Sequence, residues 1–363
     1  MSYMGYFYNQ AWLRQRGFLR FTLSSCLTLF LTLFLTQLLL GCSQPRSNLL
    51  EQTFYTFGTK VTIQIHHPDL AQAQAAISQI EQRFYAFHQQ WHAWQPDSML
   101  SAINRAIAAG EPIKVDNQTQ AFIEKSQQLS AQTDYLFDPA IGGLLRLWGF
   151  QGQTDWQPPS EHERQTWLQN RPSIADIYFI DNQLHSYHPG VQLDFGGNAK
   201  GLALEIANAI LNQHHIEHAL INIGGDLLVR GRKSNNQAWS IGIQNPKNPQ
   251  NRLQAIAQIQ AQDGDTIFTS GTYQRYFEWQ GQRYSHILNP NTAWPADSFA
   301  SVTVIHPDPI LADTAATALL IAGPKHGQRI AQQLGVTKFL TIDQQGHINL
   351  SPEMQKQTVN IKG

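Results

Sequence analysis

The segment DFGGNAKG, residues 194–201, places a carboxylate and an ammonium group on either side of a glycine pair. Residues 191–195 alternate between apolar and polar side chains, which predicts a strand, and the residues after Lys200 follow a helical pattern. A strand, a glycine turn and a helix N-terminus together present backbone N–H groups to an anion. Two interpretations follow. Asp194 and Lys200 grip a polar ligand at this turn, or they form an ion pair that closes it.

A second pair of polar residues, Asp313 and Thr317, lies in the segment ADTAAT at 312–317. A spacing of four residues puts both side chains on one face of the helix that we expect over 313–321. A carboxylate beside a hydroxyl offers hard oxygen ligands, which suit Mg²⁺ better than zinc. Asp313 also stands near the start of the expected helix, where an acidic residue complements the helix dipole. The magnesium and the capping interpretations both stay open.

Two further residues could accept a proton. His286 ends an expected strand before a proline turn, where it could be a general base near neutral pH or make a structural hydrogen bond. Asp226 follows the glycine pair 224–225 in a turn between two expected strands. It is a second candidate base, and a structural role for it is equally open.

The N-terminus has the layout of an export signal. Arg14, Arg16 and Arg20 precede an uncharged apolar run at 21–40, which leads to Leu-Leu-Gly-Cys ending at Cys42. A run of this length could also span a bilayer, so an uncleaved anchor is the alternative. The Leu-Leu-Gly-Cys sequence resembles the lipobox of bacterial lipoproteins, and this resemblance implies that Cys42 becomes the lipidated N-terminus.

We therefore expect a lipoprotein signal peptide at 1–41, a lipidated tether at 42–50 and an exported domain at 51–363. The protein would face the periplasm in a bacterial cell envelope, held by Cys42 to the inner or the outer membrane. Cys42 is the only cysteine after the signal, so the domain has no internal disulfide and no thiolate metal site. A formal net charge of −1 gives no electrostatic reason to expect a nucleic-acid partner.

The expected elements mix helices with hairpin-like strands and do not follow a strict βαβ series, so we predict a single large α+β domain. Residues 156–173 are polar and contain prolines, which indicates a surface excursion. The main expected elements are a strand at 54–65 with a turn at 58–59, helices at 70–90, 119–133 and 202–214, a strand–turn–strand at 218–230, and strands at 239–244, 253–260 and 301–306.

Eight segments, taken in order, resemble the FAD:protein FMN transferase family, also called the ApbE flavin transferases. They are FGT at 57–59, WHAWQPDSMLSAIN at 91–104, FDPAIGGLLRLWGF at 137–150, DFGGNAKG at 194–201, NIGGD at 222–226, TSGTYQRY at 269–276, HILNP at 286–290 and ADTAAT at 312–317. The resemblance implies the ApbE type of α+β fold, with two closely packed halves.

The resemblance also implies an activity. Family members bind FAD and Mg²⁺, transfer FMN to a threonine or serine hydroxyl of an exported redox protein, and release AMP. Typical acceptors are flavin subunits of sodium-pumping NADH:quinone oxidoreductases and Rnf-type complexes, in a motif resembling D-G-x-[ST]-[SG]-A-T. The same residues would also serve an FAD pyrophosphatase, which uses water in place of the acceptor, or a non-enzymatic FAD-binding lipoprotein.

The family pattern assigns roles residue by residue. Asp313, Thr317 and the backbone oxygen of Gly197 match the metal ligands, and His286 matches the probable base. The residues that match FAD contacts are Phe57, Trp94, Ala140, Ile141, Gly142, Asp194, Lys200 and Ile287. The chain departs from the usual pattern at Asn289, which replaces an aspartate, at Ala293, which replaces a glycine, and at Asn198, where an apolar residue is common.

Overall fold

The structure is a computed structural model that describes residues 48–152, 156–233, 236–248 and 255–361. The predicted signal peptide, Cys42 and the tether up to residue 47 lie outside the described residues. Within the described ranges, no helix combines the length and the apolar character needed to cross a membrane.

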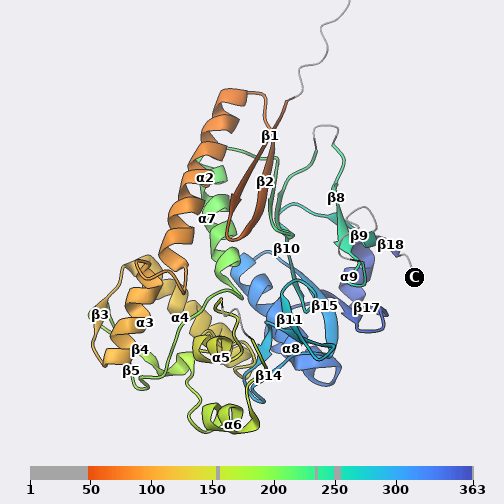
Figure 1. Cartoon of the computed structure of the whole chain (residues 1–363). Helices are drawn as coiled ribbons and strands as arrows, with labels where there is room; N and C mark the ends of the chain where they lie inside the picture. The colour runs from red at the N-terminus through yellow and green to blue at the C-terminus, as the bar shows by residue number, and fades with distance from the viewer. Residues whose placement is uncertain (1–47, 153–155, 234–235, 249–254, 362–363) are drawn as a thin grey trace, which may run out of the picture. The chain divides into compact units, whose positions relative to one another are not determined.

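An antiparallel sheet of eight strands forms the centre of the described chain (Figure 1). In spatial order its strands are β1 (Leu49–Thr56), β2 (Thr59–His66), β6 (Ala219–Ile223), β7 (Asp226–Arg230), β10 (Thr266–Gly271), β15 (Phe299–His306), β16 (Lys338–Asp343) and β17 (Ile348–Leu350). The predicted strand at 54–65 is thus a hairpin, which turns at Phe57 and Gly58 with φ of 57° and 69°.

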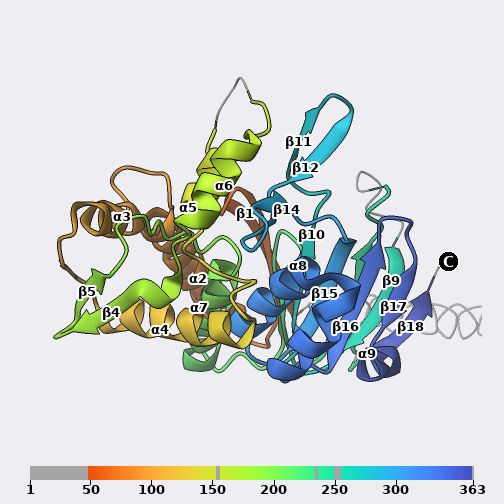
Figure 2. The same cartoon turned by 90° about the horizontal axis from the view of Figure 1, so that it is seen from below.

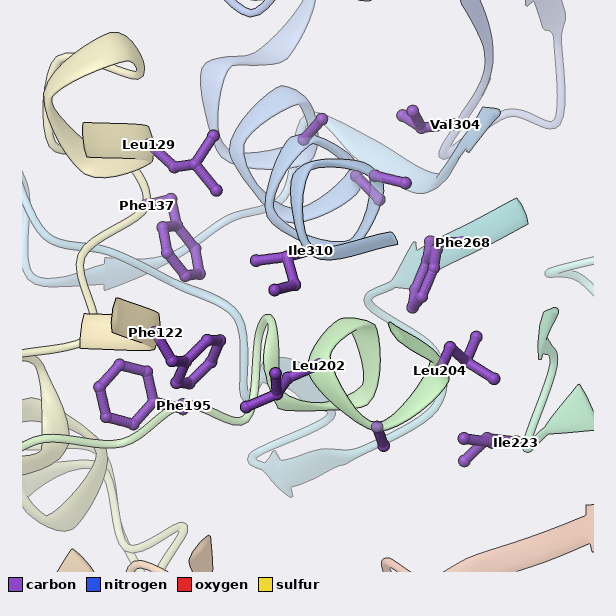
Figure 3. Packing of buried hydrophobic residues seen from close by; sticks show 14 of the residues in the cluster. Phe122, Leu129, Phe137, Phe195, Leu202, Leu204, Ile223, Phe268, Val304 and Ile310 are labelled. Atoms are coloured by element: carbon purple, nitrogen blue, oxygen red, sulfur yellow. The ribbon is translucent and has the colours of Figure 1, made fainter. Parts of the chain in front are cut away.

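Three helices cover one face of this sheet: α2 (Leu70–Trp91), α7 (Ala199–Gln213) and α8 (Pro309–Gln333). The alternation within β6 shows how the sheet meets them, because Ala219, Ile221 and Ile223 are buried while the residues between them are half-buried on the other face. Figure 3 shows Leu204 of α7 between Phe268 of β10 and Ile223 of β6.

A smaller sheet covers part of the opposite face. Its strands, in spatial order, are β18 (Thr358–Ile361), β9 (Ala255–Ala261) and β8 (Trp239–Gln244), and α9 (Pro352–Gln357) packs against them. Ile241 and Ile259 of this sheet share a second apolar core with Leu227 and Ile267 of the central sheet.

The remaining described elements lie outside these two sheets and the three covering helices. They are α3 (Met99–Ala109), β3 (Ile113–Lys114), α4 (Asn117–Gln132), α5 (Gly142–Leu147), α6 (Glu161–Gln169), the 3₁₀ helix η1 (Ile174–Asp176), β4 (Ile177–Ile180), β5 (Gln183–Ser186), β11 (Tyr276–Trp279), β12 (Gln282–Ser285), β13 (Leu288–Asn289) and β14 (Trp294–Pro295). The β11–β12 hairpin projects from the fold in Figure 2. Helices and antiparallel strands in this arrangement confirm the predicted α+β class.

The predicted strand at 191–195 is wrong, although its apolar residues are buried. The Asn104 side chain pairs with both backbone groups of Leu193, donating to its oxygen at 2.9 Å and accepting from its nitrogen at 2.7 Å. Asp194 N donates to Pro139 O at 2.8 Å. A side chain and a loop therefore satisfy backbone groups that a neighbouring strand would otherwise pair.

The helix expected over 313–321 is also wrong in its start, because α8 begins at Pro309. The Asp308 side chain accepts hydrogen bonds from two amides of the first turn, at 3.0 and 3.1 Å. Asp308 is therefore the helix cap. Asp313 lies inside the helix, which removes the capping interpretation for this residue.

The surface excursion expected over 156–173 is wrong at Trp156, which is only 9% exposed. Its ring stacks on Phe277 with centroids 4.6 Å apart, in a third apolar cluster that includes Trp148. The segment also contains α6. The mostly polar segment 156–173 therefore contains one large aromatic residue, Trp156, that is buried in the apolar cluster.

The closest backbone approach in the core predicts a test of stability. A Cβ atom added at Gly201 would lie 2.5 Å from Pro309 O and 2.7 Å from Ile310 Cα. Gly201→Ala should therefore force α7 and α8 apart and lower the free energy of unfolding by about 1–3 kcal/mol or more. Gly143→Ala in α5 is the matched control, since its nearest atom would be 3.8 Å away. Equal unfolding midpoints for the two variants would contradict this packing.

Candidate active site

The crossing of α7 and α8 brings the two polar segments together. Gly201 lies against the first residues of α8, and its amide donates to Asp313 Oδ2 at 3.0 Å. Because only a hydrogen atom occupies the Cβ position of Gly201, the two helices can approach this closely. DFGGNAKG and ADTAAT therefore face each other across this contact.

Oxygen atoms from several elements gather beside this crossing. Thr317, one turn after Asp313, has its Oγ1 2.9 Å from Ser270 Oγ of β10. A Cβ atom at Gly197 would lie 3.5 Å from Thr317 Oγ1, which places the glycine turn directly against this hydroxyl. Asp313 is 4% exposed. The three residues predicted to hold the metal ion thus line one common space.

The oxygen ligands available beside the α7–α8 crossing fit a magnesium ion. Asp313 Oδ2 accepts from Gly201, and its other oxygen accepts no hydrogen bond from the residues that the structure describes. Across those residues, no group of three His, Cys, Asp or Glu side chains gathers as a metal site. A carboxylate, a hydroxyl and a backbone carbonyl are the hard oxygen ligands that Mg²⁺ prefers. The assignment of Gly197, Asp313 and Thr317 to this ion stays a prediction.

Lys200 forms an ion pair with Asp226, so the pairing between Asp194 and Lys200 that would close the turn is wrong. Asp226 is 3% exposed and also accepts from Thr269 N at 3.0 Å. Burial opposes the charge on Lys200, but Asp226 and Asp313 outweigh burial and raise the pKa of this lysine. Lys200 therefore carries a fixed positive charge, and the contacts of Asp226 favour the structural role over the role of base.

The amides of the glycine turn are mostly occupied by the protein itself. Asp194 Oδ1 accepts from Gly196 N at 2.8 Å, and Phe195 O accepts from the amides of Asn198 and Ala199 at 3.0 and 2.7 Å. The expected row of free N–H groups is therefore not present here. Burial raises the pKa of Asp194.

His286 is held in one tautomer. Its Nδ1 lies 3.0 Å from Arg275 O, and because a carbonyl oxygen only accepts, Nδ1 carries the proton. Nε2 is then left with its lone pair. Burial lowers the pKa of His286 to about 4, and although the bond to Arg275 O opposes this, the charges of Arg275 and Lys200 add to it. The ring is therefore neutral at pH 7, as a general base must be.

These side chains surround one cavity of about 330 Å³. The predicted site residues that line it are Trp94, Ile141, Asp194, Gly197, Lys200, His286, Ile287, Asp313 and Thr317. We call it the central cavity. Its lining also includes polar residues that were not predicted as site residues, among them Ser270 and Arg275. Both belong to the segment TSGTYQRY, so their place in a family segment was the available signal.

Three predicted FAD contacts lie outside the central cavity. Phe57 lines an adjacent pocket of about 220 Å³, which shares Trp94, Asp194 and Lys200 with it and is mostly aromatic. Gly142 lines another neighbouring pocket that also includes Trp94 and Asp194. Ala140 is fully buried and lines none of these three spaces; it reaches the site only through its neighbour Ile141.

The state of His286 predicts a proton NMR titration. The pKa of about 4 lies below the usual histidine value of 6.5. The ring should therefore stay neutral as the pH falls through 6.5 and take up a proton only near pH 4. His286→Gln identifies the resonance by its loss. A His286 midpoint near 6.5 would show that the ring is not desolvated in this way.

Comparisons with known proteins place the chain in a family. A model of the ApbE family matches residues 57–340. The chain is 35% identical to an FAD:protein FMN transferase of Rhodobacter capsulatus over 86% of its own length and 59% of that protein. It thus spans about three fifths of that relative. A Vibrio cholerae FAD:protein FMN transferase is 30% identical over 81% of this chain and 87% of that protein.

Solved structures of ApbE proteins have the same fold as this chain. The ApbE protein of Thermotoga maritima superposes with a TM-score of 0.78 at 28% identity, covering 86% of this chain and all of that one. The flavin transferase ApbE of Vibrio cholerae gives a TM-score of 0.74 at 25% identity, covering 85% of this chain and 99% of that one. The family model, the relatives and the shared fold lead to one conclusion: this chain belongs to the ApbE family.

Proposed function

We propose that this protein is an FAD:protein FMN transferase, which moves FMN from FAD to a serine or threonine hydroxyl of another protein and releases AMP. The observation that carries the proposal is the central cavity, where a fixed cation, a cluster of oxygen ligands and a neutral histidine meet. The relatives of this chain bear the name of this activity.

In the proposed reaction, the acceptor hydroxyl oxygen forms a bond to the FAD phosphorus on the riboflavin side. The bond from that phosphorus to the bridging oxygen breaks, and AMP leaves with that oxygen. His286 Nε2 takes the hydroxyl proton, because its lone pair is free and the ring is neutral. The ammonium group of Lys200 faces the dense negative charge of the pyrophosphate.

Asp313, Thr317 and the carbonyl of Gly197 are the residues that would hold Mg²⁺. When bound, this ion would neutralise charge on the phosphate oxygens. The protein residues around this position keep the ligands in place: Gly201 donates to one oxygen of Asp313, and Ser270 contacts the Thr317 hydroxyl.

The flavin ring system would lie on the aromatic side of the site. Trp94 lines both the central cavity and the pocket that contains Phe57, and Ile287 adds an apolar contact. Flat aromatic rings gain from stacking on side chains of this kind. Asp194 lines both spaces and would contact the part of FAD between the ring and the phosphates.

We also propose that the protein works outside the cytoplasm of a bacterium, anchored through a lipid on Cys42. The basis is the charged, apolar and Leu-Leu-Gly-Cys pattern of the N-terminus. Its acceptors would then be proteins exported to the same compartment, such as flavin subunits of Nqr or Rnf type with a D-G-x-[ST]-[SG]-A-T-like motif.

Mass spectrometry separates the proposed function from its alternatives. The protein is incubated with FAD, Mg²⁺ and an acceptor domain that carries the motif. A gain of one FMN in the intact mass of the acceptor supports transfer. Release of FMN and AMP at the same rate without acceptor would show a pyrophosphatase, and unchanged FAD would show a binding protein.

Removing the proposed magnesium ligand should abolish transfer. Asp313→Asn keeps the shape of the side chain but replaces a carboxylate oxygen that could bind the cation with an amide nitrogen, so we expect transfer to fall by at least about 10²-fold at millimolar Mg²⁺. Asp308→Asn is the matched control, because it changes a carboxylate of the same helix that caps the first turn, and asparagine also caps helices well. Full transfer by Asp313→Asn would contradict the metal assignment.

Removing the proposed base should slow transfer but leave FAD bound. A general base typically contributes about 10²–10⁴-fold, so His286→Ala should lose that factor in kcat. FAD affinity, followed by quenching of flavin fluorescence, should stay within a few-fold. His347→Ala, an exposed histidine paired with Asp343, controls for the loss of an imidazole. Equal rates for the two variants would rule out His286 as the base.

A further inference from the structure

A second cavity, of about 300 Å³, opens where the smaller sheet lies over the central sheet. Strand β6 forms one wall and strand β8 forms the other. The residues that define this β8 groove are Leu220, Asn222, Gly225, Ser240, Gly242 and Gln244.

Strand β8 is an edge strand. In the described part of the chain it pairs only with β9, and β18 forms the opposite edge of the same sheet. An edge strand directs alternate N–H and C=O groups away from its partner, and these groups can pair with another extended chain. Strand addition of this kind is a common way in which proteins bind a peptide segment.

The β8 groove adjoins the central cavity. Thr269 and Gln274 line both spaces. Thr269 N donates to Asp226, the partner of Lys200, so the groove reaches the central cavity on its cationic side. The aromatic pocket with Phe57 has no lining residue in common with the groove. A flavin and a polypeptide would therefore approach the same phosphate from different sides.

The residues that line the β8 groove indicate what kind of polypeptide segment could bind there. Among the residues that the structure describes, its lining contains no Asp, Glu, Lys or Arg side chain. Leu220 offers a half-buried apolar surface, and the space around the absent Cβ of Gly225 is open, with no atom within 4 Å. An extended segment whose side chains are small and mostly uncharged fits such a space, as in the acceptor motif, where one aspartate precedes small residues. A wider cavity of about 910 Å³ near α6 has no lining residue in common with the central cavity, so it offers no such route.

We propose that the acceptor protein docks by adding an extended segment to β8 in this groove, so that the hydroxyl of that segment passes Thr269 and Gln274 and reaches the FAD phosphate. This inference rests on the proposed function, because it requires a nucleophile carried by a protein chain. It adds the acceptor site, which lies apart from the FAD pocket.

Hydrogen exchange tests the docking without any turnover. The probe is a synthetic peptide containing Asp-Gly-Ala-Ser-Gly-Ala-Ala, in which alanine replaces the acceptor threonine, added to the full protein with FAD and Mg²⁺. Strand addition should slow exchange of the amides in 239–244. The amides in 358–361, on the opposite edge of the same sheet, serve as the internal control.

A matched pair of variants tests the groove in turnover with the threonine form of the peptide. Leu220→Arg fills the groove with a long charged side chain and should raise KM for the peptide by at least about tenfold, or about 1.4 kcal/mol. FAD affinity of the same variant checks that its fold is intact. Val359→Arg adds the same side chain to β18, where Val359 is 51% exposed, and should leave KM unchanged.

The outcomes separate this inference from the proposed function. Protection of 239–244 together with the KM effect of Leu220→Arg supports both. FMN transfer to the threonine peptide without protection of 239–244 overturns the docking site and leaves the transferase. Protection without any FMN transfer keeps the docking site and overturns the transferase. Neither protection nor transfer overturns both.

Discussion

The contact between α7 and α8 at Gly201 is the constraint on which the site depends. It lets the two helices approach until backbone touches backbone, and it brings the glycine turn of α7 against Asp313 and Thr317 of α8. Any larger residue at Gly201 would separate the two segments that carry the proposed phosphate chemistry. The polar residues of the site can therefore come together only because the two helices pack this closely at Gly201.

The charge of Lys200 beside this crossing is stabilised by two neighbouring carboxyl groups. Lys200 lies between Asp226 and Asp313, and both carboxylates are nearly buried. Buried charges of this kind add little net stability, so their presence points to function. Asp226 fixes the lysine, and Arg275 fixes the tautomer of His286 through its backbone oxygen. The two groups proposed to act on the substrate, Lys200 and His286, are thus each held by a neighbouring residue.

The sequence predicted the regular elements better than the contacts between them. The periodicity of 70–90 predicted α2, and the glycine pair 224–225 predicted the turn between β6 and β7, because both patterns are local. The strand at 191–195 failed because Asn104, distant in sequence, pairs with Leu193. The ion pair considered between Asp194 and Lys200 is wrong for the same reason, because the residue that pairs with Lys200 is Asp226, which is distant in sequence.

Within the site, the resemblance predicted nine of the residues that line the central cavity, but Phe57, Ala140 and Gly142 lie outside it. Local patterns alone left the role of each residue ambiguous. Asn198, which departs from the family pattern, is fully buried and donates to Ser126 Oγ at 2.9 Å. It thus ties the glycine turn to α4. No spacing in the sequence could reveal this bond, since it joins two elements through the fold.

In the function proposed above, the α7–α8 crossing would bind a metal ion in contact with the FAD phosphate. Electron–nuclear double resonance with Mn²⁺ in place of Mg²⁺ tests it most directly. With FAD bound, we expect hyperfine coupling between Mn²⁺ and ³¹P in the unaltered protein, and loss of this coupling in Asp313→Asn. Bound FAD and Mn²⁺ without ³¹P coupling, or the same coupling in Asp313→Asn, would contradict it.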